Sequence, residues 1–466
     1  MPNCSGYPVH PLTIGALLIV VPDRDLAEIY LSSTHPHFRR NFCLLLTDYV
    51  CFGAAFSLVS VNTVVPDFVS RLTSSDVIIG LSGALYMFAW LVPQLLLAQM
   101  VNRRTRRKPI MAWTVVPFRM TMLVMAGLIA VSDGTDSSGI LLTFMSFYVM
   151  FALGDGLITI VWADLLASSI PEHWRGILFS TGQIGVSITV LGAREIVRLL
   201  LGPDGPLFPH NYAAMFGIAA VVFVIGGCAL ASMVEEQSQV PVEPGPPMRQ
   251  YVAYLGRVLR EDRDFLRLMV TRLLFDLTTM ALPFYVVFGA TGLLLPRETL
   301  VGDSILLGTI GTTVGSLLTG WLSRRSGSRA VIRVSGIASL FHPALAFLSL
   351  VFGQPALYAA FLVNGFVTAA VTPGYFDWII THAPPDRRPI YVGLANTISA
   401  VSHLAPFFGG IVLSLTSYPI LFGSSALIAL VGIVSTLGLS EPRQRPSTIA
   451  ARPPQPVESL ASPNAR

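Results

Sequence analysis

Twelve long apolar runs, separated by short charged connections, constrain the fold of this chain more than any other feature. Each run is about as long as the ~20 residues that an α-helix needs to cross the ~30 Å hydrocarbon core of a bilayer. The runs lie at 41–65, 76–99, 109–132, 139–165, 176–201, 212–234, 265–290, 301–322, 330–352, 355–380, 389–415 and 417–439. Of the 466 residues, 53% are hydrophobic and only 12% are charged, about half the charged share of a soluble protein. The sequence therefore predicts an all-α polytopic membrane protein with twelve transmembrane helices.

The two halves of the chain carry the same pattern in the same direction. An Asp, a Pro and an Arg in the first half recur with the same spacing 213 positions later. The two sets are Asp164, Pro171 and Arg175, and Asp377, Pro384 and Arg388. Each set closes the fourth run of its half and opens the fifth. A direct repeat of this size is typical of transporters, so we expect two six-helix bundles, at 41–234 and 265–439.

The arginines predict the orientation of the chain in the membrane. They are concentrated in the even-numbered connections and near both termini, and Arg194 and Arg198 are the main exceptions. By the positive-inside rule, both termini and the long middle segment are expected in the cytoplasm, which places the protein in the cell membrane (plasma or inner). We expect a cytoplasmic tail at 1–40, an amphipathic helix on the membrane surface within the linker 235–264, and a disordered tail at 440–466.

Several classes of function are disfavoured by the sequence. The net charge of +4 is small, so no nucleic-acid partner is expected. The four cysteines have no metal or redox spacing, so neither a metal site nor a cofactor is expected. The chain contains no His-Glu-x-x-His, Gly-x-Ser-x-Gly or phosphate-loop motif. His382 and Asp386 fall in a short, Pro-containing connection, which we expect to be solvated. We therefore expect no enzymatic activity.

A basic motif lies between the second and third runs and again between the eighth and ninth. With two six-span halves and a basic central segment, it makes the chain resemble the major facilitator superfamily, whose loop motif is Gly-x-x-x-Asp-Arg-x-Gly-Arg-(Arg/Lys). The matching residues are Arg103, Arg106 and Arg107 in the first copy, and Gly320, Arg325, Gly327 and Arg329 in the second. Ala98, Asn102 and Thr105 depart from the motif in the first copy, and Arg324 in the second.

The resemblance implies a secondary transporter that works by alternating access, with its substrate site near the membrane midplane between the halves. It also implies a cytoplasmic charge network that holds the outward-facing state. Its members would be the motif arginines Arg103, Arg106, Arg107, Arg325 and Arg329, with Asp164, Arg175, Asp377 and Arg388. In the alternative interpretation, the motif arginines only fix topology and contact lipid phosphates. The span 4 and span 5 motifs of drug/proton antiporters are absent, which argues against multidrug export.

Polar residues within the spans are the candidates for substrate binding or coupling, because they are costly in a membrane. The candidates are Asp48, Asp155, Gln183, Arg272, Asp276, Tyr375 and Asn396. Asp48 and Asp155 have no partner in their own spans, which makes proton or cation coupling a hypothesis. Arg119 is expected to be structural.

Two pairs of candidates also have a structural interpretation. Arg272 and Asp276 are four residues apart and share a helix face, so they are substrate contacts or a structural ion pair. Gln183 and Asn396 are related by the 213-residue shift, and they are expected either in a site on the pseudo-two-fold axis or in interhelical hydrogen bonds.

The expected partners are a small solute of unknown class, the lipid bilayer and, under the coupling hypothesis, protons. The protein is expected to act as a monomer. A non-transporting receptor or scaffold and a membrane-embedded enzyme are the alternatives. A water-accessible central cavity lined by both halves would favour a transporter over a scaffold, because a transporter needs one and a scaffold does not.

Overall fold

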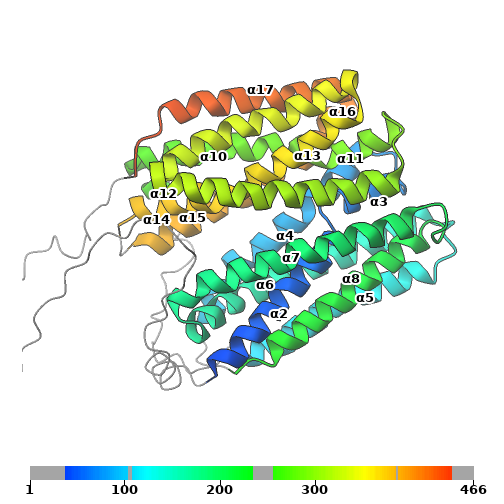
Figure 1. Cartoon of the computed structure of the whole chain (residues 1–466), viewed down its shortest axis with the longest axis horizontal. Helices are drawn as coiled ribbons and strands as arrows, with labels where there is room; N and C mark the ends of the chain where they lie inside the picture. The colour runs from blue at the N-terminus through cyan, green and yellow to red at the C-terminus, as the bar shows by residue number, and fades with distance from the viewer. Residues whose placement is uncertain (1–36, 103–107, 235–255, 385–386, 443–466) are drawn as a thin grey trace, which may run out of the picture.

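The computed structural model describes residues 37–102, 108–234, 256–384 and 387–442 (Figure 1). Within these ranges, every regular element is a helix. Nine of the described helices are long and apolar enough to cross a membrane, and the shorter helix Asp76–Leu91 is also apolar. The protein is therefore embedded in a membrane by many helices. Most of the two predicted tails, the motif arginines of the first half and most of the linker lie outside the described residues.

The first half of the chain forms one long helix for each of its six predicted spans. These are α2 (Phe38–Leu58), α4 (Asp76–Asn102), α5 (Lys108–Ala130), α6 (Ser137–Ser169), α7 (Glu172–Leu201) and α8 (His210–Ala231), with the short α3 (Val64–Ser70) between the first two. α7 is not among these nine helices, and it carries Arg194, Glu195 and Arg198 near its C-terminal end.

The second half also places its predicted spans in helices, but several of these are interrupted or fused. The elements are α10 (Arg263–Leu277), η1 (Thr278–Ala281), α11 (Leu282–Thr291), α12 (Arg297–Phe352), α13 (Gln354–Ala369), η2 (Val371–Phe376), α14 (Asp377–His382), α15 (Arg388–Ser402), α16 (Ala405–Leu415) and α17 (Tyr418–Leu437). The π-helical turn η2 contains Pro373, which supplies no backbone N–H to a regular helix. Breaks of this kind are tolerated in a membrane where they are buried in protein.

The eighth and ninth predicted spans are fused into the 56-residue α12. The helix bends at Gly327, whose φ of 77° is the left-handed conformation that side chains other than glycine adopt at a cost. Gly327 belongs to the second copy of the basic motif. The positive φ at Gly327 lets the chain turn between the eighth and ninth predicted spans without a separate loop. This conformation explains why a glycine stands at this position of the motif.

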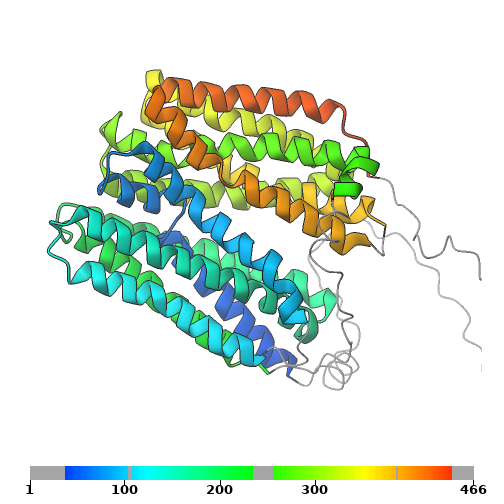
Figure 2. The ribbon, with the colours of Figure 1, turned by 180° about the vertical axis from the view of Figure 1, so that it is seen from behind.

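The two halves lie closest at one end of the molecule and separate toward the other (Figures 1 and 2). The closed end, as we call it, contains α3 and α11, whereas α2 begins and α17 ends at the opposite, open end. Five pairs of helices join the halves: α4 with α11, α15 and α16, α7 with α12, and α3 with α11.

Packing follows the same division. At the closed end, one apolar cluster runs through both halves and includes Phe68 and Leu300. Toward the open end, each half has its own cluster, around Val161 in the first half and Trp378 in the second. Glycine allows the close contact between halves, because a Cβ on Gly80 would lie 2.2 Å from the Pro406 carbonyl oxygen.

Candidate substrate-binding and coupling site

A cavity of about 440 Å³ lies among α2, α4, α5, α6 and α7 of the first half. Its volume is within the range of small-molecule sites. Aromatic side chains form much of its wall: Tyr49, Phe52, Phe56, Tyr86, Trp90 and Trp162. Its charged and amide side chains are Asp48, Arg119, Asp155 and Gln183. Three of the predicted site residues, Asp48, Asp155 and Gln183, thus line one cavity.

Asp48 and Arg119 form a buried ion pair across α2 and α5. The Arg119 Nη1 lies 2.7 Å from the Asp48 Oδ1 and also donates to the Phe223 carbonyl oxygen at 3.0 Å. Gly226 and Gly227 on α8 leave room for the guanidinium, since an added Cβ on either would lie 3.1 Å from it or its stem. The partner of Asp48 lies on another span, so a search within the span of Asp48 did not find it.

Asp155, on α6, is buried with a neutral partner. The Tyr86 hydroxyl donates to the Asp155 Oδ2 at 2.8 Å, and both residues are at most 5% exposed. Across the described part of the chain, Asp155 takes part in no ion pair of 4 Å or less. The cavity therefore contains two carboxyl groups and one guanidinium, and the guanidinium is paired with Asp48.

α4 and α6 approach closely beside Asp155. A Cβ on Gly156 would lie 2.2 Å from the Trp90 carbonyl oxygen, so the helices are in backbone contact there. The Trp90 indole N–H donates to the Thr159 hydroxyl at 3.0 Å, which in turn donates to the Asp155 carbonyl oxygen at 2.8 Å. These bonds fix the wall of the cavity around the Asp155 carboxyl group.

The predicted residues of the second half form a separate cluster on α10, η2 and α15. The Arg272 Nε lies 3.7 Å from the Asp276 Oδ2, and the Arg272 guanidinium lies 5.4 Å from the centre of the Tyr375 ring. The Ser402 hydroxyl donates to Asp276 at 2.7 Å. Asn396 is exposed on α15 and does not line the 440 Å³ cavity that Gln183 lines.

A second cavity, of about 200 Å³, lies between the halves, bounded by the α2–α3 segment, α12 and α13. Its lining is rich in small polar residues, among them Ser60, Asn62, Ser304, Thr312 and Asn364. The sequence analysis missed its hydroxyl groups. The spacing of Ser304, Gly308 and Thr312, four residues apart on one face of α12, was the available signal.

Four of the nine predicted members of the cytoplasmic charge network cannot be placed. Arg103, Arg106, Arg107 and the side chain of Asp164 lie outside the described residues. The Arg175 Nε donates to the Ile170 carbonyl oxygen at the end of α6, and the Arg388 Nε donates to the Ile380 carbonyl oxygen in α14, at 3.0 and 3.1 Å. Both repeat-related arginines thus contact carbonyls at a helix C-terminal end, where a cation is favourable.

The other predicted members of this network lie apart from one another. Asp377 is exposed. The Arg325 guanidinium lies 5.4 Å from the centre of the Trp321 ring, and Arg329 pairs with Glu441 at 3.2 Å. None of these contacts joins the two halves.

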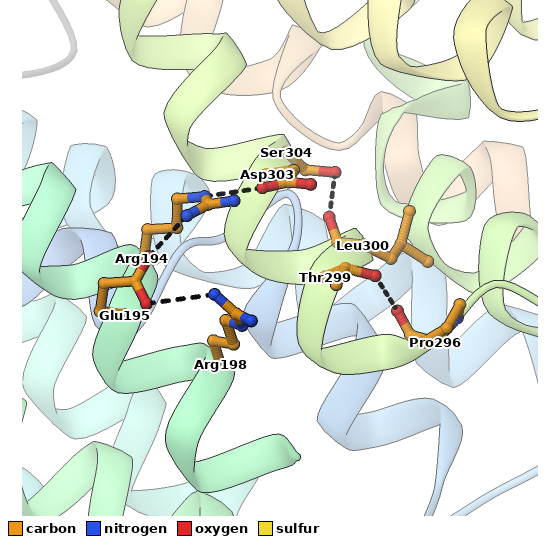
Figure 3. A network of polar contacts seen from close by, with 8 residues as sticks. All are labelled: Arg194, Glu195, Arg198, Pro296, Thr299, Leu300, Asp303 and Ser304. Carbon is orange, nitrogen blue, oxygen red and sulfur yellow. Dashed lines mark hydrogen bonds and ion pairs between the residues drawn. The ribbon is translucent and has the colours of Figure 1, made fainter.

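Charged contacts join the two halves at the closed end instead. Figure 3 shows Arg194 of α7 pointing to Asp303 of α12, with 2.7 Å between the Arg194 Nε and the Asp303 Oδ1. Glu195 accepts from the same guanidinium at 2.5 Å. The sequence analysis noted Arg194 only as an exception to the positive-inside rule. That exception was the sequence feature that could have indicated a contact between the halves.

A second pair across the halves lies at the same end. Arg297, which begins α12, donates to Asp67 of α3, and Asp67 also accepts from the Tyr212 hydroxyl. Asp67 is fully buried. Both of its contacts are with charged or polar groups, as a buried carboxylate requires.

His382 lies in a buried polar cluster at the open end, so the expectation that it is solvated is wrong, whereas Asp386 lies outside the described residues. Its Nε2 lies 3.0 Å from the Asp262 Oδ2, and Asp262 also accepts from the Tyr391 hydroxyl at 2.9 Å and the Phe265 N–H at 3.1 Å. Burial raises the pKa of Asp262, but these hydrogen bonds outweigh it and hold the pKa at about 2. The cluster ties α10, α14 and α15 together.

Comparison with known proteins gives a family and a fold. The family model described as the Major Facilitator Superfamily matches residues 49–405 and 298–464. A search of curated proteins gives no match.

Three solved structures share the fold. A D-xylose-proton symporter gives a TM-score of 0.64 at 16% identity, covering 88% of this chain and 100% of that one. A bacterial homologue of the iron transporter ferroportin, in an inward-facing state, gives 0.64 at 16%, covering 86% and 98%. An auto-inhibited POT family peptide transporter gives 0.63 at 14%, covering 86% and 96%. The match of the family model over most of the sequence shows that this chain belongs to the major facilitator superfamily.

Proposed function

We propose that this protein is a secondary active transporter that moves a small solute across a cell membrane by alternating access. The observation that carries the proposal is the 440 Å³ cavity inside the first half, with Asp48, Arg119 and Asp155 in its lining. Ionisable groups are costly within a membrane and are retained where they have a function. A scaffold has no need of a cavity lined by both halves, and the 200 Å³ cavity bounded by the α2–α3 segment, α12 and α13 is of that kind, which favours transport over that alternative.

The contacts between the halves support an alternating mechanism. Arg194–Asp303 and Arg297–Asp67 hold the halves together at the closed end, whereas the described ion pairs Arg329–Glu441 and Asp262–His382 at the open end each lie within the second half. With the orientation that the arginines predict, the open end faces the cytoplasm and the conformation is inward-facing. In the outward-facing state, the closed-end pairs would separate and the cytoplasmic charge network would form.

We propose Asp155 as the group that takes up a coupling proton. Three ionisable groups face it from other helices: Tyr86 on α4, Arg119 on α5 and Asp48 on α2. Tyr148, on α6 itself, stacks near Tyr86. Arg119 is committed to Asp48, so a charged Asp155 lacks a cation, and a proton would neutralise it at little structural cost.

Alternation can be tested without knowing the substrate. In a background without native cysteines, spin labels at Asp204 and Leu294 report on the closed end, and labels at Ser232 and Ser326 on the open end. We expect two distance populations for each pair, with changes of opposite sign between them when pH or a stabilising ligand is varied. A single population for both pairs under every condition would contradict the proposed function.

The ligand for this experiment comes from a thermal-stability screen. A bound solute raises the melting temperature of the purified protein by mass action. A screen of sugars, peptides, nucleosides, organic anions and organic cations should yield at least one class that stabilises the wild type. Uptake of that class into proteoliposomes, driven by a pH gradient, then tests the role of Asp155. Asp155→Asn should abolish the response of uptake to the gradient, whereas Asp155→Glu, which keeps a carboxyl group, should retain it.

A further inference from the structure

We propose that the 440 Å³ cavity binds an organic monocation with an aromatic or other apolar body, whose positive group lies next to Asp155. This inference rests on the proposed transport function and adds the substrate class. It concerns the charge and shape of the substrate.

The charges in the cavity wall are the first reason. Arg119 is the cavity's one cationic side chain, and Asp48 neutralises it at 2.7 Å. The Asp155 carboxyl group then leaves the cavity with one formal negative charge. An anionic solute would meet this charge with no uncommitted cation to balance it. A cationic solute would supply the partner that a buried carboxylate needs.

The hydrogen bonds of Asp155 are the second reason. Its Oδ2 accepts from the Tyr86 hydroxyl, and both side chains are buried. A tyrosine hydroxyl stabilises a carboxylate without neutralising it. A buried carboxylate normally accepts more hydrogen bonds than this single one from a neutral donor. The second Asp155 oxygen is therefore where an ammonium or other cationic group of a substrate would stabilise the carboxylate most.

The aromatic wall is the third reason. The rings of Tyr49, Phe52, Phe56, Trp90 and Trp162 line the cavity together with Tyr86. Aromatic faces attract cations at distances up to about 6 Å. One ring already does so, because the Arg119 guanidinium lies 5.7 Å from the centre of Phe52. A solute with its charged group beside Asp155 and its apolar body against these rings would complement both the carboxylate and the aromatic part of the wall.

The same lining disfavours a sugar or other polyol. Such a solute needs many hydrogen-bond partners, yet the Tyr86 hydroxyl is bonded to Asp155 and the Trp90 indole N–H to Thr159. Gln183 is the only amide side chain in the wall. Small polar groups are instead gathered in the separate 200 Å³ cavity between the halves.

The test uses two probes of nearly equal size and opposite charge, tetraphenylphosphonium and tetraphenylborate. Binding to the full-length protein in lipid nanodiscs is measured by equilibrium dialysis, with empty nanodiscs as the correction for partitioning into lipid. We expect saturable binding of tetraphenylphosphonium and none of tetraphenylborate. Asp155→Asn should weaken phosphonium binding by at least about tenfold, given the strength of one charge–charge contact in a protein interior.

Two variants serve as controls. Asp155→Glu keeps the charge and should retain phosphonium binding within about threefold. Asp204→Asn removes an exposed carboxylate from the α7–α8 connection and should leave binding unchanged. If gel filtration or the melting temperature shows that Asp155→Asn does not fold, the cation proposal is tested by comparing the binding of the two probes to the wild type.

Equal binding of both probes, or unchanged phosphonium binding in a folded Asp155→Asn variant, would overturn the cation proposal. Such a result is distinguishable from failure of transport itself. If a neutral or anionic solute from the thermal screen drives the opposite distance changes at the two ends, transport stands and the cation class falls. If the labels never move with any ligand, the transport proposal falls.

Discussion

Arg194 of α7 and Asp303 of α12 lie 2.7 Å apart and join the two halves of the molecule at its closed end. Their side chains are 29% and 22% exposed, so water reaches the pair. Ion pairs of this kind contribute ~0.2–1 kcal/mol. A contact of this strength is suited to a gate, because it biases a conformation without locking it.

Removing this pair should shift the protein away from the closed-end conformation. We expect Arg194→Ala or Asp303→Asn to increase the population with a long distance between labels at Asp204 and Leu294 by up to about fivefold, corresponding to ~1 kcal/mol. The double variant should shift it no further than either single variant, since both remove one interaction.

Arg198→Ala is the matched control for this prediction. Arg198 lies on the same helix, but its ion pair is with Glu195 of α7 at 3.7 Å and does not cross between the halves. The distance distribution should therefore remain that of the wild type. An equal shift in Arg198→Ala would show that the effect is general to the charge of α7.

Breaking the Asp48–Arg119 pair should destabilise the fold strongly. Asp48→Asn leaves the guanidinium buried without its carboxylate, a change that costs about 3–5 kcal/mol in comparable pairs. Arg119→Met should cost a similar amount, whereas Asp48→Asn combined with Arg119→Met should cost much less than the sum. Unfolding in denaturant measures these differences. Additive losses would mean that the two residues act independently.

The sequence predicted the architecture well because its signals are local. Apolar runs of spanning length and arginines between them follow from the requirements of the bilayer, and the repeat of Asp164 and Asp377 revealed the two halves. The long-range contacts were harder to predict. Asp48 is paired with Arg119, 71 positions away, and no spacing rule connects residues on different helices.

Only part of the candidate site could be predicted, again because contacts between different helices have no signal in the sequence. Asp155 and Gln183 were predicted because polar residues are costly in a span, but no spacing rule connects the Tyr86 hydroxyl on α4 with Asp155 on α6, 69 positions away. Asp67 and Arg297 were counted only as loop charges. The contact between Asp67 and Arg297 depends on how the two halves pack against each other, and this packing is determined by many residues of both halves.

Close packing of α12 against α13 gives a prediction with a control one turn away. A Cβ on Gly311 would lie 2.0 Å from the Leu362 carbonyl oxygen, whereas a Cβ on Gly308 would meet nothing within 4 Å. Gly311→Ala should force the helices apart and cost about 1–3 kcal/mol. Gly308→Ala should be neutral or slightly stabilising, as alanine favours a helix. Similar melting temperatures for both variants would contradict this account of the interface.

Asp262, which directly precedes α10, should make stability depend on pH in acid. Its hydrogen bonds with His382, Tyr391 and the Phe265 N–H hold its pKa at about 2 in the folded protein, compared with about 3.9 in an unfolded chain. Because the folded pKa is the lower one, the stabilisation is fully present above about pH 4 and is lost as pH falls through about 2. The difference in free energy of unfolding between wild type and Asp262→Asn should therefore shrink by ~2 kcal/mol from pH 5 to pH 2.

The comparison with Asp264→Asn separates this effect from general acid unfolding. Asp264 lies in the first turn of the same helix, and its ion pair is with the exposed Arg267 at 3.6 Å. Since Asp264 has no comparable set of buried hydrogen bonds in the described structure, its variant should keep a nearly constant difference from the wild type over the same pH range. If Asp262→Asn also ran parallel to the wild type, the three hydrogen bonds could not be what holds the open ends of α10, α14 and α15 together.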